Sequence, residues 1–170
     1  EIEEKRLALG GTLEQLGIDD KEPALSSSEK QATVGDLLTS RSGVYHPVDS
    51  EPIAVAMLRP LRGSHPPGTF WYYNNWDFNA LGTIYEKVTG QGIFTAFETR
   101  IGKAVRLEDF RVEACRYGET NLSRHRDYAF RMSARDLARF GSLYLRSGQW
   151  ENRQIVPSHW VAESVRPHVN

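Results

Sequence analysis

The sequence predicts an α+β protein, of which these 170 residues form mostly the helical part. Apolar residues recur at helical spacing in several stretches, and most of these stretches begin with a residue type that caps helices. Strand-like alternation is scarce, so we expect the sheet to come mostly from sequence outside the chain. No internal repeat and no long linker is present, and we therefore expect a single segment over 1–170 without an internal domain boundary.

The first elements are short. Helical composition over 1–16 is interrupted by two consecutive glycines, and a polar connection follows over 17–31. Thr33 and Asp36 then form a Thr-x-x-Asp capping pair, in which the threonine side chain accepts from the third helical amide. This pair predicts a short helix that ends near Thr39.

The middle of the chain predicts three further helices. The first covers 50–61, because a serine caps it and a proline is tolerated in its first turn. The second runs over 77–89 and is stopped by the glycine that follows. The third covers 93–101. After it, 111–116 has the composition of a strand and 118–127 that of a loop.

The clearest helix is expected over 133–145, where Ser133 and Asp136 form a second capping box. One face of this helix gathers its apolar and small residues, namely Leu137, Phe140, Gly141 and Tyr144. A last helix is expected over 157–165.

Composition narrows the class of protein. Hydrophobic residues make up 39% and charged residues 25%, which is ordinary for a soluble protein, and the net charge is −1. The arginines over 124–139 are interpreted as a solvated helix face, and no nucleic-acid partner is expected. No apolar run approaches the length of a membrane span.

No cofactor or metal is expected. The single cysteine, Cys115, excludes an internal disulfide, and the five histidines do not have the spacing of metal ligands. Residues 125–127 spell the start of a kinase catalytic loop, but Met132 stands where that loop needs asparagine. Residues 90–92 lack the third glycine of a dinucleotide-binding fingerprint and fit a helix stop instead.

The most informative window runs over 66–78 and combines turn formers, aromatic residues and amides. Its Pro-Pro-Gly turn and the helical spacing after it place Tyr73 and Asn75 on a short segment just before a helix. Such a segment is typical of an active-site loop. Trp71 and Trp76 are candidates for lining a substrate cleft, although aromatic residues beside a buried helix more often belong to a core.

Three blocks in this chain carry a family resemblance. Tyr73-Asn74-Asn75 reads as Tyr-x-Asn, with Pro-Gly-Thr before it and Leu-Gly after it; the stretches 32–43 (ATVGDLLTSRSG) and 133–141 (SARDLARFG) flank it in order. Together they resemble penicillin-recognising serine hydrolases, a group of class C β-lactamases, DD-peptidases and family VIII carboxylesterases. The resemblance covers most of the chain apart from 111–124 and the last three residues. It implies a β-lactamase/transpeptidase-like fold.

Members of this group share three catalytic elements, a Ser-x-x-Lys helix, the Tyr-x-Asn loop and a Lys/His-x-Gly strand. Only the second is found here. Ser27-Ser28-Glu29-Lys30 matches the first by its letters, but it lies in a Pro/Ser-rich stretch without apolar periodicity, so we interpret Ser27 as an ordinary loop serine. Residues 1–9 resemble the exposed end of the nucleophile helix. We therefore expect the nucleophile before residue 1, which leaves any signal peptide open.

The resemblance implies hydrolysis of an amide or ester, whether a β-lactam, a peptide or a carboxylic ester, through a serine acyl-enzyme. Tyr73 would relay the serine proton together with a lysine, and Asn75 would orient that lysine and bond a substrate amide. From the residues alone, Tyr73 could equally be a core tyrosine and Asn75 a turn cap.

Two alternatives remain open. The chain could belong to a catalytically inactive relative that kept the fold as a binding or scaffold protein. Within the enzyme class, the substrates could exclude β-lactams and be limited to peptides, short amide oligomers or simple esters. Expected partners are a small-molecule amide or ester and the rest of the protein's own chain, and the resemblance favours a periplasmic or secreted bacterial protein.

Overall fold

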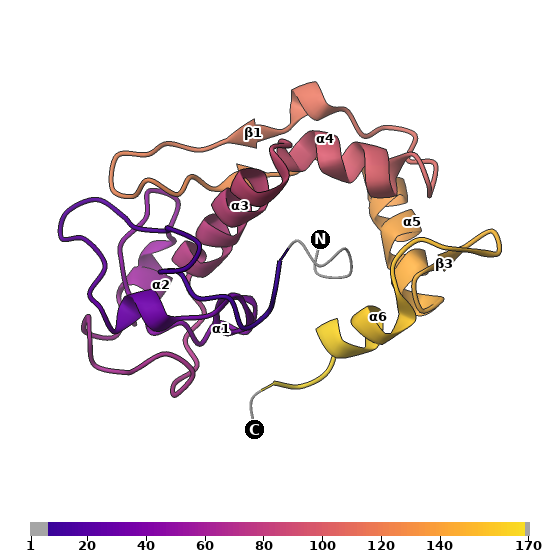
Figure 1. The fold of residues 1–170 in the computed structure, drawn as a ribbon. Coiled ribbons are helices and arrows are strands. Elements are labelled where there is room, and N and C mark those ends of the chain that lie inside the picture. Colours follow the sequence, from indigo (N-terminus) through magenta and orange to yellow (C-terminus); the bar gives the residue numbers. More distant parts are fainter. Residues whose placement is uncertain (1–6, 169–170) are drawn as a thin grey trace. The chain divides into compact units, whose positions relative to one another are not determined.

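The computed structural model describes residues 7–168, and most of its regular structure is helical (Figure 1). In chain order the elements are the 3-10 helix η1 (Glu29–Gln31), α1 (Val34–Leu38), α2 (Ile53–Ala56), α3 (Asn75–Thr89), α4 (Ile93–Phe97), the π-helical turn η2 (Glu98–Gly102), the 3-10 helix η3 (Val112–Ala114), β1 (Arg116–Tyr117), β2 (Tyr128–Ala129), α5 (Ala134–Leu145), β3 (Gln149–Trp150), β4 (Arg153–Gln154) and α6 (Ser158–Ser164). No helix of the described part is long and apolar enough to cross a membrane.

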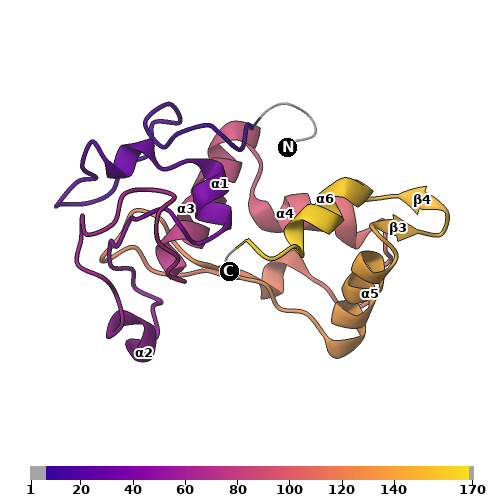
Figure 2. The same ribbon diagram turned by 90° about the horizontal axis from the view of Figure 1, so that it is seen from below.

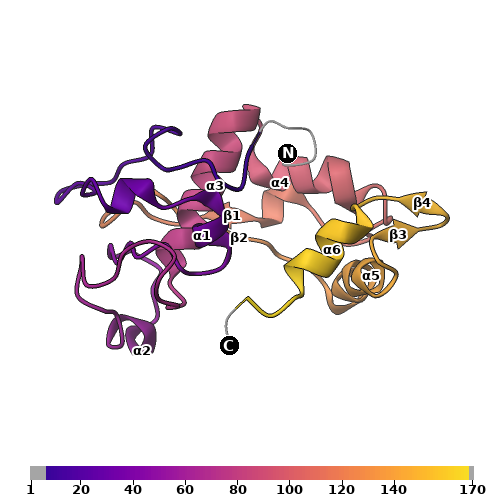
Figure 3. The same ribbon diagram turned by 60° about the horizontal axis from the view of Figure 1, so that its bottom comes forward.

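The chain forms two compact units, each built from two separate stretches of sequence. The first unit comprises Glu1–Gln91 and Tyr117–Tyr128, and the second comprises Gly92–Arg116 and Ala129–Asn170. Strands β1 and β2 pair as a small two-stranded sheet (Figure 3). The first unit contains the Tyr-x-Asn loop, so the site is described within that unit.

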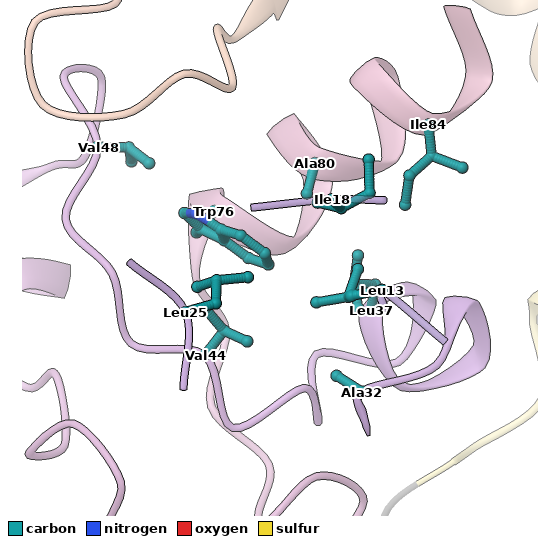
Figure 4. Packing of buried hydrophobic residues seen from close by; sticks show 10 residues of the cluster. All are labelled: Leu13, Ile18, Leu25, Ala32, Leu37, Val44, Val48, Trp76, Ala80 and Ile84. Atoms are coloured by element: carbon teal, nitrogen blue, oxygen red, sulfur yellow. The ribbon is translucent and has the colours of Figure 1, made fainter. Parts of the chain in front are cut away.

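The core of the first unit forms where α1 lies beside α3 (Figures 1 and 3). Trp76, Ala80 and Ile84 are spaced four residues apart, so they share one face of α3, and none of the three is exposed to solvent. Leu37 of α1 and Leu13 from the preceding segment pack on this face (Figure 4). Burying each large side chain contributes about 1.5–3 kcal/mol, which fixes α3 relative to the segments around it.

The helix ends follow the sequence signals. Thr33 and Asp36 form the predicted capping box at the start of α1. The side chain of Asn74 accepts a hydrogen bond from the Asp77 amide at 2.9 Å and so caps α3, and α3 ends at Gly90 with a left-handed φ of 67°. The capping box and the stop at Gly90 confirm the predictions, whereas α3 begins two residues before the predicted start and its Asn74 cap was not predicted. The predicted helix over 157–165 is also found, as α6.

Residues 7–16 are not helical, contrary to the prediction over 1–16, whose first six residues lie outside the described part. Thr12 forms an antiparallel bridge with Thr33, and the Leu13 amide donates to the carbonyl oxygen of Ala32 at 2.9 Å. This pairing buries Leu13 completely. Several backbone groups that a continuous helix would pair locally are therefore used in bonds to a distant segment.

Two other elements differ from prediction. The helix expected over 50–61 is only the four-residue α2, whose N-cap Pro52 has no side chain that could accept from the first turn. The strand expected over 111–116 is a 3-10 turn, η3, and only its last residue enters β1. Strand composition did not determine the conformation here, because η3 is closed by local backbone bonds.

Helix α5 is correctly bounded, but its buried face is not the predicted one. Leu137 is 54% exposed, whereas Asp136 and Leu143 are fully buried. The Asp136 carboxylate accepts from the backbone amides of Glu108 and Asp109 at 2.8 and 3.0 Å. Only the serine half of the predicted capping box forms, because Asp136 binds this distant loop instead of the amide of Ser133.

A hairpin in the second unit was not predicted. Strands β3 and β4 pair in the register Gln149↔Gln154 and Trp150↔Arg153 (Figure 2). The two residues between them, Glu151 and Asn152, have φ values of 45° and 63°, as a tight hairpin turn requires. Two-residue strands give too short an alternation to be recognised in the sequence.

Candidate active site

The Tyr-x-Asn loop is held by backbone bonds to the segment that follows α1. We define the site loop as residues 66–75. The Gly68 amide donates to the carbonyl oxygen of Arg41 at 2.8 Å, and the Tyr72 amide donates to that of Ser40 at 3.0 Å. The Arg41 guanidinium also donates to the Gly68 carbonyl oxygen. The Ser-Gly block and the Tyr-x-Asn block, which are separate in the sequence, therefore form one structure.

Gly43 allows this close approach. Its φ is +70°, and a Cβ atom at this position would lie 2.5 Å from the carbonyl oxygen of His65. A larger residue would have to push the backbone of residues 65–67 away. The glycine of the Ser-Gly pair is thus required by both its backbone conformation and its contact with the site loop.

Beneath the site loop, Ser42 and Asp77 form a fully buried pair. The Ser42 hydroxyl donates to Asp77 Oδ1 and accepts from the Val44 amide at 3.0 Å. Asp77 lies in the first turn of α3 and is 0% exposed. Its Oδ2 has no hydrogen-bond partner in the described residues. Sequence analysis did not identify this pair, although the serine belongs to a recognised block.

Burial determines the ionisation of Asp77. Loss of contact with water raises the pKa of the Asp77 carboxyl well above its usual value, and the hydrogen bond from Ser42 opposes this only in part. The carboxyl group is therefore neutral in the folded protein under conditions where an exposed aspartate is ionised.

Asp77→Asn should stabilise the protein at neutral and alkaline pH. As pH rises above about 4, the usual value for aspartate, ionisation of Asp77 favours the unfolded chain, so the parent loses stability until the folded carboxyl also titrates. Asparagine does not titrate and still accepts from Ser42. Thermal melts from pH 4 to pH 8 should show a Tm advantage of the variant that grows with pH.

The matched control is Asp19→Asn, for which the opposite sign is expected. A hydrogen bond from Lys30 at 2.6 Å lowers the pKa of Asp19 to about 2. Its contribution is present above about pH 4 and disappears as pH falls toward 2, so this variant should be less stable at pH 7 and equal to the parent near pH 2. An Asp77→Asn advantage that does not change with pH would contradict the assignment of a neutral carboxyl.

The structure places the two predicted catalytic side chains at the surface of the site loop. Tyr73 is 48% exposed, and its ring lies 5.5 Å from that of Phe78 between centroids. Its hydroxyl has no hydrogen-bond partner among residues 7–168, unlike that of a core tyrosine. The Asn75 amide nitrogen donates to the carbonyl oxygen of Ser50 at 3.2 Å, which leaves the side-chain oxygen as an acceptor.

The two tryptophans differ. Trp71 is 51% exposed on the site loop and remains a candidate for substrate contact. Trp76 is fully buried, and its indole nitrogen donates to Asp20 Oδ2 at 2.6 Å. The prediction that Trp76 contacts substrate does not agree with this position. Its four-residue spacing to Ala80 and Ile84 was the sequence signal for the core.

A second segment is attached to the site loop. The Tyr72 hydroxyl donates to the carbonyl oxygen of Val55 in α2 at 2.7 Å. The apolar side chains of this segment point into solvent, with exposures of 77–84% for Ile53, Met57, Leu58 and Leu61. Together with the bond from Asn75 to Ser50, this contact holds 50–55 beside Tyr73.

Ser27 is not arranged as a nucleophile. It lies in an exposed turn before η1, and Lys30 binds the carboxylate of Asp19. Among the described residues, no three His, Cys, Asp or Glu side chains are grouped to hold a metal ion.

The Ser-Gly turn holds the site loop at the start of α3. The fold is β-lactamase/transpeptidase-like, as the family match and the solved structures show. The chain belongs to the beta-lactamase family, whose model matches residues 7–169. No curated protein sequence matches it. The Tyr-x-Asn, Ser-Gly and α5 blocks all lie within the matched range.

Solved structures agree on the fold. A Bacillus anthracis protein assigned as a 6-aminohexanoate-dimer hydrolase is 22% identical, with a TM-score of 0.67 over 95% of this chain and 47% of its own. A Bacteroides dorei protein assigned as a beta-lactamase is 17% identical, with a TM-score of 0.61 over 92% and 48%. A penicillin-binding protein homologue from Caulobacter crescentus is 17% identical, with a TM-score of 0.63 over 99% and 57%. The chain thus spans about half the length of these structures.

Proposed function

We propose that this chain is the helical region of a serine hydrolase that acts on an amide or ester through a serine acyl-enzyme. The observation that carries the proposal is the position of Tyr73. Tyr73 is 48% exposed and its hydroxyl has no partner among the described residues, while the loop is fixed by buried contacts. A family of hydrolases supplies the reaction class.

In this proposal, Tyr73 acts as the proton relay. A serine hydroxyl must lose its proton as it attacks the carbonyl carbon, and the leaving nitrogen or oxygen must gain one. Tyr73 takes up the serine proton as its own hydroxyl proton passes to the lysine amine, and the lysine–tyrosine pair then returns one proton to the leaving group, so no net proton is consumed in acylation. The nucleophilic serine and its lysine lie in sequence outside residues 1–170.

Asn75 is proposed to orient the site. Its amide nitrogen is engaged by Ser50, so its free oxygen can accept from the lysine ammonium or from an N–H of the substrate. The amide group does not titrate, and this contact therefore does not depend on pH. Trp71, beside Tyr73 on the same loop, is the proposed apolar contact for substrate.

The substrate class follows from chemistry shared by the relatives. A 6-aminohexanoate dimer contains an amide bond, and a beta-lactamase acts on a strained cyclic amide. We therefore propose a small amide or ester as substrate. The likeness to a penicillin-binding protein homologue favours a periplasmic or secreted location.

Acylation of the full-length protein tests the proposal. Incubation with nitrocefin or 4-nitrophenyl acetate, followed by acid quenching and mass spectrometry of the intact protein, should show one acyl group per molecule. Peptide mapping should place it on a serine outside residues 1–170. Residues 1–170 alone should not turn over either substrate, because the nucleophile and the lysine are absent.

Ser27→Ala is the control. In the full-length protein it should leave acylation unchanged, because Ser27 is exposed and Lys30 is already bound to Asp19. Turnover by residues 1–170 alone that is abolished by Ser27→Ala would show instead that Ser27 is the nucleophile.

A further inference from the structure

We propose that Asp20 is a positioning residue that holds the start of α3, and with it the direction in which Tyr73 and Asn75 point. The inference rests on the proposed function, because it assigns a task to Asp20 within that site. The inference is carried by a buried hydrogen-bond cluster around Asp20 in the first unit. Its other members, Trp76 and Ser123, lie far from Asp20 in the sequence, and the sequence did not predict the cluster.

Asp20 is 2% exposed and accepts from both a side chain of α3 and the loop over 121–127. Its Oδ2 accepts from the Trp76 indole nitrogen and from the Ser123 hydroxyl, each at 2.6 Å. Its Oδ1 accepts from the backbone amides of Lys21 and Arg124, each at 2.7 Å. Every acceptor position of the carboxylate is thus engaged, two donors to each oxygen.

The donor set requires a carboxylate. An indole N–H and a backbone N–H can only donate, so an amide nitrogen in place of Oδ2 would face Trp76 with no acceptor. Burial acts to raise the pKa of Asp20, but the hydrogen bonds from Ser123, Trp76 and the backbone outweigh it and lower the pKa below its usual value. Asp20 is therefore ionised in the folded protein. The His46 ring lies against the same oxygen, with Nδ1 3.5 Å from Oδ2.

The cluster reaches the site through consecutive residues. Asn75 and Trp76 are neighbours in the first turn of α3, followed by Asp77, which binds Ser42. Trp76 and Asp77 are each fixed by a buried hydrogen bond to a different segment. These two bonds determine how the first turn of α3 is rotated about the helix axis and where it lies along that axis. Proton transfer needs heavy atoms about 2.6–3.2 Å apart, and a misplacement of about 1 Å can cost a hundredfold in rate.

Trp76→Phe in the full-length protein tests the link. Phenylalanine keeps an aromatic ring in the core but removes the N–H that binds Asp20. We expect kcat to fall about tenfold, with KM within twofold of the parent. The substrate contacts remain, but the orientation of the Tyr73 side chain is less strictly fixed. Hydrogen exchange of a peptide covering 70–78 should also increase, which reports the same loosening without any assay of activity.

Ser123→Ala is the matched control. It removes the other bond to the same Oδ2, together with the bond that the Ser123 hydroxyl oxygen accepts from the His125 amide at 3.0 Å, so Tm should fall in both variants. Ser123 does not contact α3 through this bond, and kcat and the exchange of 70–78 should therefore stay near the parent. Combined with Tyr73→Phe, the Trp76→Phe change should have little additional effect on kcat, because it acts through Tyr73.

Two results would overturn the inference. The first is an equal loss of kcat in Trp76→Phe and Ser123→Ala, with the loss in each fully additive to that of Tyr73→Phe. The second is unchanged hydrogen exchange over 70–78 in Trp76→Phe. Failure of the proposed function gives a different result, namely no acyl-serine in the parent protein. The exchange measurement then still decides whether Asp20 holds this loop.

Discussion

Tyr73→Phe should slow acylation by about a hundred- to ten-thousand-fold, the usual contribution of a general acid–base, while the fold survives. This is equivalent to about 3–5 kcal/mol of barrier. The ring is retained, so its contact with Phe78 is kept, and the hydroxyl makes no bond within the described residues that the variant would lose. Single-turnover kinetics with a nitrophenyl ester, together with a thermal melt, would measure both effects.

Tyr72→Phe is the internal control for this prediction. Its hydroxyl bonds the backbone of Val55 and takes no part in the proposed chemistry, so the rate should stay within a few-fold of the parent. The lost bond should cost about 1 kcal/mol of stability. If Tyr72→Phe abolishes acylation while Tyr73→Phe does not, the assignment of the motif is wrong by one residue. If neither changes the rate, the catalytic role of this loop is wrong.

Gly43→Ala should destabilise the full-length protein by about 2–5 kcal/mol, combining the left-handed backbone with overpacking. The added Cβ would lie 2.5 Å from the His65 carbonyl oxygen and 3.3 Å from backbone atoms of Pro66 and Pro67. These are backbone atoms, which cannot rotate away as the end of a side chain can. Urea denaturation should show a large drop in midpoint, and kcat should fall because the site loop moves.

Gly63→Ala and Gly90→Ala separate the two causes. Both glycines have a similar φ, +78° and +67°, but a Cβ at either position meets no atom within 4 Å. Each variant should therefore lose only the backbone contribution of about 1–2 kcal/mol. A Gly43→Ala protein as stable as these two would mean that residues 65–67 yield easily and do not clamp the site loop.

Some of the site could be predicted because its signals are local. The capping box of Thr33 and Asp36, the helix stop at Gly90 and the bounds of α5 depend on residues within one or two turns of each other. Tyr73 and Asn75 were predicted just before a helix over 77–89; Tyr73 does precede α3, but the helix begins two residues earlier, at Asn75 itself. The family was also indicated by local blocks, and the match over 7–169 confirms it.

Contacts between distant segments account for what was missed. Residues 7–16 have helical composition, but Leu13 pairs with Ala32, and this bond together with the burial of Leu13 replaces a local helix. In α5, Asp136 has the right spacing for a capping box, yet it accepts from two amides nearly thirty positions earlier. In both cases a tertiary contact outweighed a local preference of similar or smaller free energy.

The sequence by itself determined that the chain is mostly helical, that it has the blocks of a serine hydrolase family and where the site loop lies. Only the tertiary structure decided that Trp76 belongs to the core and that Asp20, Ser42 and Asp77 support the loop. The physical reason is that a hydrogen bond such as that from Trp76 to Asp20 joins residues far apart in the chain. Neither the residue types nor their spacing in the sequence specify that Trp76 and Asp20 are partners. The pairing is fixed only when the core between these two residues has formed.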